Sequence, residues 1–186
     1  MKEKKYKEAL ETLENAMLQC DKELKPISPS NNSISKLKSE ELKGIPIRWR
    51  LLRAEALIMN NDYHEALNIA EIILNSPGNS NNSEANTLKT KLLFIMGKSN
   101  VDNAVKYIRK AYMSYNKNEK AKILIKKIPE IEEKKKNIND NFFNNERYEE
   151  AIQKYDELIN ECKDICLTGT ILVILLRNKC SCLIKV

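Results

Sequence analysis

Glycine, proline and aromatic residues are scarce in this chain of 186 residues. Four glycines and five prolines interrupt a sequence in which 31% of the residues are charged and Lys, Glu, Leu and Ile are abundant. These side chains lose little rotamer freedom in a helix, and few helix breakers are present. The sequence therefore predicts an all-α fold, and its 42% apolar residues are enough for a core.

Long apolar runs are also missing. No stretch reaches the roughly 20 apolar residues that a membrane-spanning helix needs. The first residues, Met1 to Tyr6, are mostly charged and lack the apolar segment of a signal peptide. A cytoplasmic protein is expected, with the nucleus as a further possible location, and no membrane partner is expected.

Histidine occurs once, and residues for catalysis are lacking around it. No Asp, Ser or Cys is arranged with His64 as a nucleophile and base would require, and the sequence has no glycine-rich phosphate loop. The prediction is a protein that is not an enzyme and has no cofactor.

Five cysteines are present, Cys20, Cys162, Cys166, Cys180 and Cys182. Cys162 and Cys166 are four residues apart, so on a helix they could offer two thiolates to zinc. The favoured interpretation is buried reduced thiols, without a metal.

The net charge of +6 raises the question of a nucleic-acid partner. Acidic residues are interspersed with the basic ones, and no stretch alternates arginine with aromatic residues as a nucleic-acid platform would. No nucleic-acid partner is expected.

A short pattern recurs four times along the chain. An aromatic or apolar residue stands three positions before an alanine, and apolar or aromatic residues follow the alanine at +4 and +7, on one helical face. The four copies are Tyr6-x-x-Ala9, Tyr63-x-x-Ala66, Val101-x-x-Ala104 and Tyr148-x-x-Ala151. We call these alanines the signature alanines.

Three of these helices follow a second apolar-periodic segment and a short polar turn. The segments are 51–59, 88–96 and 131–143, and the turns include 60–62 and 144–147. Two helices with a small residue at their crossing form an αα-hairpin. One hairpin cannot bury its own apolar face, so neighbouring hairpins are expected to stack.

This pattern resembles the tetratricopeptide repeat, a unit of roughly 34 residues. The resemblance implies a right-handed superhelical solenoid, with repeats at 47–80, 85–118 and 132–165. Residues 1–24 would be the second helix of a partial repeat, and 25–46 a Pro/Ser/Asn-rich insertion. Residues 119–131 would form a helical junction in which Pro129 marks a break and the start of a new helix. Residues 169–186 would be the first helix of a truncated repeat.

The last predicted helix is strongly apolar over 171–176. Without a partner it would expose an adhesive surface, so a further segment, a dimer partner or the following repeat is expected.

The order of these elements also resembles tetratricopeptide co-chaperones of the DnaJ type. The single histidine is followed by Glu65 and Ala66, so the His-Pro-Asp loop of a J domain is absent here, and the resemblance places that domain beyond Val186. The implied partners are the 70 and 90 kDa heat-shock chaperones or client polypeptides. The alternative is a structural scaffold or oligomerisation module unrelated to chaperones.

In that family, Lys, Asn and Arg side chains of the concave groove grip the terminal carboxylate of a chaperone tail. By resemblance, Lys136 matches the first clamp lysine and Asn178 matches the second clamp asparagine. Asp140 stands where an asparagine is expected, and its carboxylate repels the ligand. The implied clamp is therefore partial.

Overall fold

A computed structural model describes residues 2–24, 44–97, 101–166 and 168–186. Within these ranges the regular elements are all helical, which confirms the predicted all-α class. The helices are α1 (Lys2–Leu24), α2 (Ile47–Met59), α3 (Tyr63–Asn75), α4 (Ser83–Ile95), α5 (Val101–Ser114), α6 (Glu119–Ile138), the π-helical turn η2 (Asn139–Phe143), α7 (Tyr148–Lys163) and α8 (Thr170–Leu183). Most of the predicted insertion, residues 25–43, lies outside the described residues.

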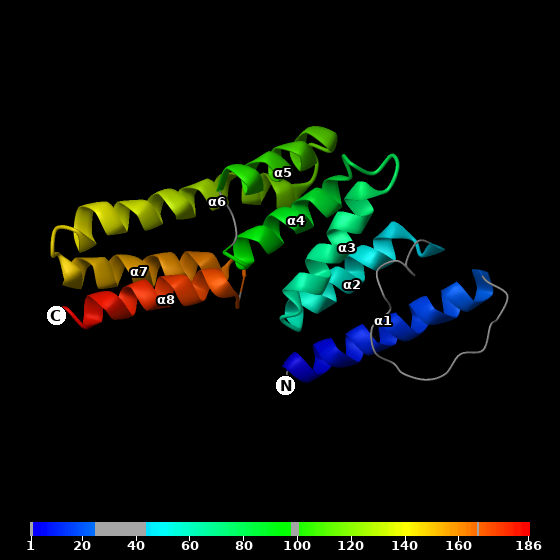
Figure 1. The fold of residues 1–186 in the computed structure, drawn as a ribbon, viewed down its shortest axis with the longest axis horizontal. Helices are drawn as coiled ribbons and strands as arrows, with labels where there is room; N and C mark the ends of the chain where they lie inside the picture. Colours follow the sequence, from blue (N-terminus) through cyan, green and yellow to red (C-terminus); the bar gives the residue numbers. More distant parts are fainter. Residues whose placement is uncertain (1, 25–43, 98–100, 167) are drawn as a thin grey trace.

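Successive helices pack as hairpins. The pairs are α2 with α3, α4 with α5 and α6 with α7, while α1 packs on α2 and α8 on α7. Figure 1 shows α6, α7 and α8 running side by side, away from the group formed by α2, α3 and α4. The start of α8 also reaches back to α4.

Two of the predicted turns have the same backbone geometry. Asn61 and Glu146 adopt positive φ angles of 66° and 61°. In both turns the next amide donates to a carbonyl five residues back, Asp62 to Leu57 and Arg147 to Phe142, each at 2.9 Å. A left-handed residue with this bond satisfies carbonyls at a helix end and reverses the chain. Both turns therefore close hairpins, as the sequence predicted.

Three of the four signature alanines lie in the core, where paired helices pack. Ala66, Ala104 and Ala151 are completely buried. Opposite Ala104 stands Thr90, also buried, whose hydroxyl lies 3.4 Å from the Ala104 carbonyl oxygen. A larger side chain at these positions would push the two helices apart.

Helix α6 corrects one prediction. Pro129 was expected to end a helix, yet α6 runs through it from Glu119 to Ile138. A proline inside a helix costs about 3 kcal/mol. Ile128 and Ile131, on either side of it, are buried in the core, and each contributes about 1.5–3 kcal/mol. Tertiary burial offsets the proline, so the predicted junction and the following helix are one element.

Ion pairs between successive hairpins share one register. In each of α2, α4 and α8, a basic residue stands directly before a small residue. This basic residue forms an ion pair with a carboxylate of the preceding helix, α1, α3 or α7. The carboxylate stands five positions after the signature alanine of that helix. The pairs are Arg53–Glu14 at 3.0 Å, Lys89–Glu71 at 2.9 Å and Lys179–Asp156 at 2.7 Å. We call this the hairpin register.

The register changes at α6. The position five after Ala104 is Arg109, which has the wrong sign for the corresponding Lys120 of α6. Lys120 pairs instead with Glu55 of α2, at 2.7 Å. Helices α2 and α6 are each the first helix of a hairpin. The Lys120–Glu55 ion pair therefore links two hairpins at the point where the hairpin register is not followed.

Candidate functional site

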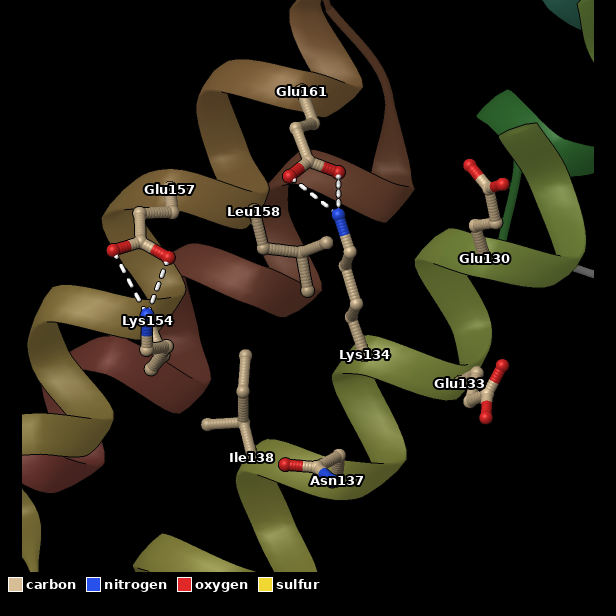
Figure 2. Close-up of a pocket in the computed structure, with 9 residues that line it drawn as sticks. All are labelled: Glu130, Glu133, Lys134, Asn137, Ile138, Lys154, Glu157, Leu158 and Glu161. Atoms are coloured by element: carbon tan, nitrogen blue, oxygen red, sulfur yellow. Dashed lines mark hydrogen bonds and ion pairs between the residues drawn. The ribbon is translucent and has the colours of Figure 1, made fainter.

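A charged hollow of about 400 Å³ lies between α6 and α7. Residues of both helices recur at three- and four-residue spacing, so they form facing stripes. Figure 2 shows them on either side of two apolar side chains, Ile138 and Leu158, which are buried. The charged and polar lining consists of Glu130, Glu133, Lys134, Asn137, Lys154, Glu157 and Glu161.

Two lysines of this hollow are held by carboxylates. The Lys134 ammonium lies 2.6 and 2.7 Å from the two oxygens of Glu161, on the opposite helix. Lys154 lies 3.0 and 2.8 Å from the two oxygens of Glu157, one turn away on α7. The hydrogen bond to Glu161 raises the pKa of Lys134 above its ordinary value, and the charges of Glu130 and Glu157 act in the same direction.

The hollow is acidic. Four carboxylates face two ammonium groups in its lining. The carboxylates of Glu130 and Glu133 point away from Lys134 in Figure 2. An open, solvated site of this charge suits lysine or arginine side chains of a polypeptide. It does not suit the terminal carboxylate of a chaperone tail.

The predicted clamp residues lie elsewhere. Lys136 is exposed on α6 and does not line the hollow, and Asp140 is exposed in η2. Asn178, on α8, is half-buried and its amide donates to the Tyr155 hydroxyl at 3.4 Å. Within the residues that the structure describes, no hydrogen bond or ion pair joins Asn178 to Lys136 or Asp140. Their role in ligand binding stays a prediction.

Asn178 belongs to a group of hydrogen-bonded polar side chains that was not predicted from the sequence. Tyr155 is completely buried on α7, and its hydroxyl donates to the Asn139 side chain at 2.5 Å while accepting from Asn178. Burial raises the pKa of Tyr155, so the hydroxyl keeps its proton and remains a donor. These hydrogen bonds link η2, α7 and α8. They therefore help to fix the position of Asp140, which follows Asn139 in the sequence. The signal in the sequence was Tyr155, a tyrosine at the +4 position of the recurring pattern.

The thiols of Cys162, Cys166 and Cys182 are buried, and Cys180 is exposed. Over the described ranges, no group of three or more His, Cys, Asp or Glu residues is placed to hold a metal ion. Burial raises the pKa of Cys162 to about 12 and that of Cys166 to about 11. Both thiols are therefore almost fully protonated at neutral pH.

The raised pKa values of the buried Cys162 and Cys166 thiols predict selective alkylation of the exposed Cys180. At pH 8 iodoacetamide should modify Cys180 at least about a hundredfold faster than Cys162 or Cys166, because only the thiolate reacts and each pKa unit lowers its population tenfold. Peptide mass spectrometry over a time course of a dilute sample measures the rates. In denaturant the three rates should converge, and equal rates in the folded chain would contradict the burial described above.

Comparison with known proteins finds a distant relative. The chain is 30% identical, over 114 residues, to the DnaJ homolog subfamily C member 7 homolog of Schizosaccharomyces pombe. It resembles part of a DnaJ-type protein. The matched segment is 61% of this chain and 23% of that protein, so the chain spans less than a quarter of the relative's length.

Other comparisons add no assignment. No protein-family model matches the chain, and no solved structure matches it. Among the helices that the structure describes, none is both long enough and apolar enough to cross a membrane.

Proposed function

We propose that this chain is a protein-interaction scaffold of the tetratricopeptide type, and that it belongs to a DnaJ-type co-chaperone that binds heat-shock chaperones or their clients. The 30% identity to a DnaJ homologue carries the chaperone part of the proposal. The stacked hairpins with buried alanines at their crossings support the repeat type. The protein acts by binding in the cytoplasm and not by catalysis.

The chaperone tail would bind on the Lys136 side of α6. The hollow, which Lys136 does not line, presents an excess of carboxylates and disfavours an acidic tail. Lys136 is exposed, and it lies one helical turn before Asp140. A terminal carboxylate requires several positive or neutral donors at once, so Asp140 opposes it.

Replacing Asp140 with asparagine should strengthen this binding by about tenfold, because it exchanges like-charge repulsion for a hydrogen-bond donor. Calorimetric titration with an acidic chaperone-tail peptide ending in a free carboxylate measures the effect. The Lys136→Ala change, made in the Asp140→Asn background, should remove the gain.

The matched control is Glu130→Gln, which removes a carboxylate that lines the hollow, six residues before Lys136 on the same helix, and should leave tail affinity unchanged within about twofold. A peptide with an amidated terminus should not bind. The proposal of tail binding fails if neither the chain nor Asp140→Asn retains the free-carboxylate peptide, and the alternative of an assembly scaffold unrelated to chaperones would then stand.

A further inference from the structure

The net positive charge of this chain is concentrated in one segment. Residues 101–127, which form α5 and the first part of α6, hold eight lysines or arginines and two acidic residues. The whole chain has 32 basic and 26 acidic residues and a net charge of +6. The segment therefore carries the entire excess, and the remainder of the chain is balanced.

Helix α5 presents its basic residues to solvent. Lys106, Arg109 and Lys110 are exposed and recur at helical spacing, so they lie on one face, and the exposed Lys117 follows in the turn to α6. Within the residues that the structure describes, none of these four cations forms an ion pair. The lysines of the segment that do pair with carboxylates all belong to α6: Lys120, Lys122 and Lys127.

The repeated pattern does not account for this charge. Lys106, Arg109 and Lys110 stand at +2, +5 and +6 from the signature alanine of α5. The residues at these positions of α7 are neutral or acidic: Gln153, Asp156 and Glu157. The three other helices with a signature alanine all carry a carboxylate at +5, where α5 carries Arg109. The positive face is therefore a property of α5 alone among these helices.

Aromatic side chains accompany the cations. Tyr112, one helical turn after Arg109, is 36% exposed, and Tyr115, just after α5, is 55% exposed. Exposed tyrosine rings offer flat apolar surfaces on which another ring can stack. We call the surface formed by these side chains the basic face: Lys106, Arg109, Lys110, Tyr112, Tyr115 and Lys117.

The apolar side of α5 is not available to a partner. Ala104, Ile108 and Ala111 are buried in the core, and α5 packs on α4 and α6. Figure 1 shows α5 at the upper edge of the molecule, beside these two helices. An amphipathic helix that binds a membrane inserts its apolar side among the lipid chains, which α5 cannot do while it is packed in this way. The basic face therefore fits a ligand that carries negative charges and flat rings.

Single-stranded RNA has both features. Its phosphates attract lysine and arginine, and its bases stack on aromatic side chains whatever their sequence. An acidic polypeptide matches the charge as well, but its carboxylate side chains leave the two tyrosine rings without a stacking partner. RNA is also the single-stranded nucleic acid of the cytoplasm, where this chain is proposed to act.

We propose that the basic face binds single-stranded RNA without sequence preference. The lysines and Arg109 contact phosphates, and the two tyrosines stack on bases. No nucleic-acid partner was expected from the sequence, because acidic residues are interspersed with basic ones over the chain as a whole. Within residues 101–127 they are not. This binding is independent of the chaperone binding proposed above.

Fluorescence anisotropy of a labelled uridine oligomer of about 12 nucleotides, titrated with the full chain, tests the proposal. The dissociation constant should be about 1 to 100 μM at physiological salt. Its logarithm should rise linearly with the logarithm of the salt concentration, with a slope of about 3, as expected for four phosphate contacts on a single strand.

Removing two cations should weaken this binding. Arg109→Gln combined with Lys110→Gln should lower affinity at least about tenfold at about 50 mM salt and lower the salt slope by about 1.4. The matched control is Lys5→Gln combined with Lys163→Gln, at exposed lysines of α1 and α7. The control has the same net charge and should keep its affinity within about twofold, because those lysines lie outside the basic face.

Stacking is tested separately. Tyr115→Ala should weaken RNA binding at least about fivefold and leave the salt slope unchanged, because it removes a ring and no charge. Tyr115→Phe keeps the ring and should bind like the original chain. The replaced residues are exposed, so circular dichroism should show an unchanged helix content for every variant.

Labelled polyglutamate with the same number of charges separates RNA from an acidic polypeptide. It should bind at least about tenfold more weakly than the uridine oligomer, because it offers carboxylates and no bases. Equal affinity for polyglutamate, or for vesicles that contain phosphatidylserine, overturns the proposal. So does a lack of RNA binding at about 50 mM salt, or an equal loss of affinity in the control variant.

Photo-crosslinking locates the contact. A uridine oligomer that contains 4-thiouridine is irradiated with the full chain, and the chain is then digested with trypsin. The oligomer should be attached to the peptide 111–117, which follows Lys110, ends at Lys117 and contains both tyrosines of the basic face. Crosslinks confined to other peptides contradict the proposed site.

Discussion

Replacing Arg53 with alanine is expected to lower the free energy of unfolding by about 3 kcal/mol. Only 1% of the Arg53 side chain is exposed, and it joins three helices: its guanidinium contacts Glu14 of α1 at 3.0 Å and Glu65 of α3 at 3.4 Å. The change leaves two carboxylates without their cation and opens a cavity. Because both glutamates keep some contact with water, the loss stays below that of a fully buried ion pair.

Urea unfolding followed by circular dichroism measures this effect. Arg48→Ala, at an exposed arginine of the same helix, is the matched control and should change stability by less than about 0.5 kcal/mol. Glu14→Gln and Glu65→Gln should be coupled, because the second change removes the last carboxylate from a buried guanidinium. Strictly additive losses would show that Arg53 does not act as a shared partner.

Substituting alanine for Gly169 should destabilise the protein by about 3 kcal/mol, a second large effect. Gly169 precedes α8 with a φ of 129°, which side chains rarely adopt. A Cβ atom there would clash with the Ile95 side chain and would lie 2.8 Å from the Ile95 carbonyl oxygen. The clash would separate α8 from the end of α4, where the C-terminal helices meet the earlier hairpins.

The matched control is Gly78→Ala. Gly78 also has a positive φ, of 78°, but a Cβ atom added there would have no neighbour within 4 Å. Its substitution should cost only the backbone strain, about 1 kcal/mol. The difference between the two unfolding free energies reports the contact with Ile95 together with the larger backbone strain of Gly169, whose φ is 129° and ψ 167°. If the two variants were equally stable, that approach would contribute nothing to stability.

The Asn61 turn strengthens the same junction. Its side-chain oxygen accepts hydrogen bonds from the hydroxyls of Tyr63 and Thr168, each at 2.7 Å. Thr168 lies just before Gly169, so the α2–α3 turn contacts the segment that leads into α8. Tyr63 begins one copy of the recurring sequence pattern, and it packs partly against the core. The contact between the Tyr63 and Thr168 hydroxyls could not be predicted from the sequence, because the two residues lie 105 positions apart.

The residues of the hairpin register are regularly spaced in the sequence. Glu14, Glu71 and Asp156 each stand five positions after a signature alanine, and Arg53, Lys89 and Lys179 each precede a small residue. The prediction of hairpins used the apolar spacing and did not use these charges. Spacing by itself does not say which helix lies opposite, so the pattern acquires meaning only with the packing order.

The acidic hollow and the predicted clamp show the same limit. Lys136 and Asp140 were chosen by resemblance, whereas Lys134 and Glu133, beside them in sequence, line the hollow. A helix turns 100° per residue, so neighbours in a run of charges face different surroundings. Which face meets α7 depends on how the two helices are rotated against each other, and burial of Ile138 and Leu158 sets that rotation.

The sequence by itself determined the helices, the two αα-turns and the small residues at the crossings, because these depend on periodicity and on nearby residues. Only the tertiary structure decided that α6 continues through Pro129 and that Asn178 binds Tyr155. These outcomes depend on burial and pairing between residues far apart in the chain. Local preferences of a few kcal/mol are overruled when such distant contacts supply as much or more.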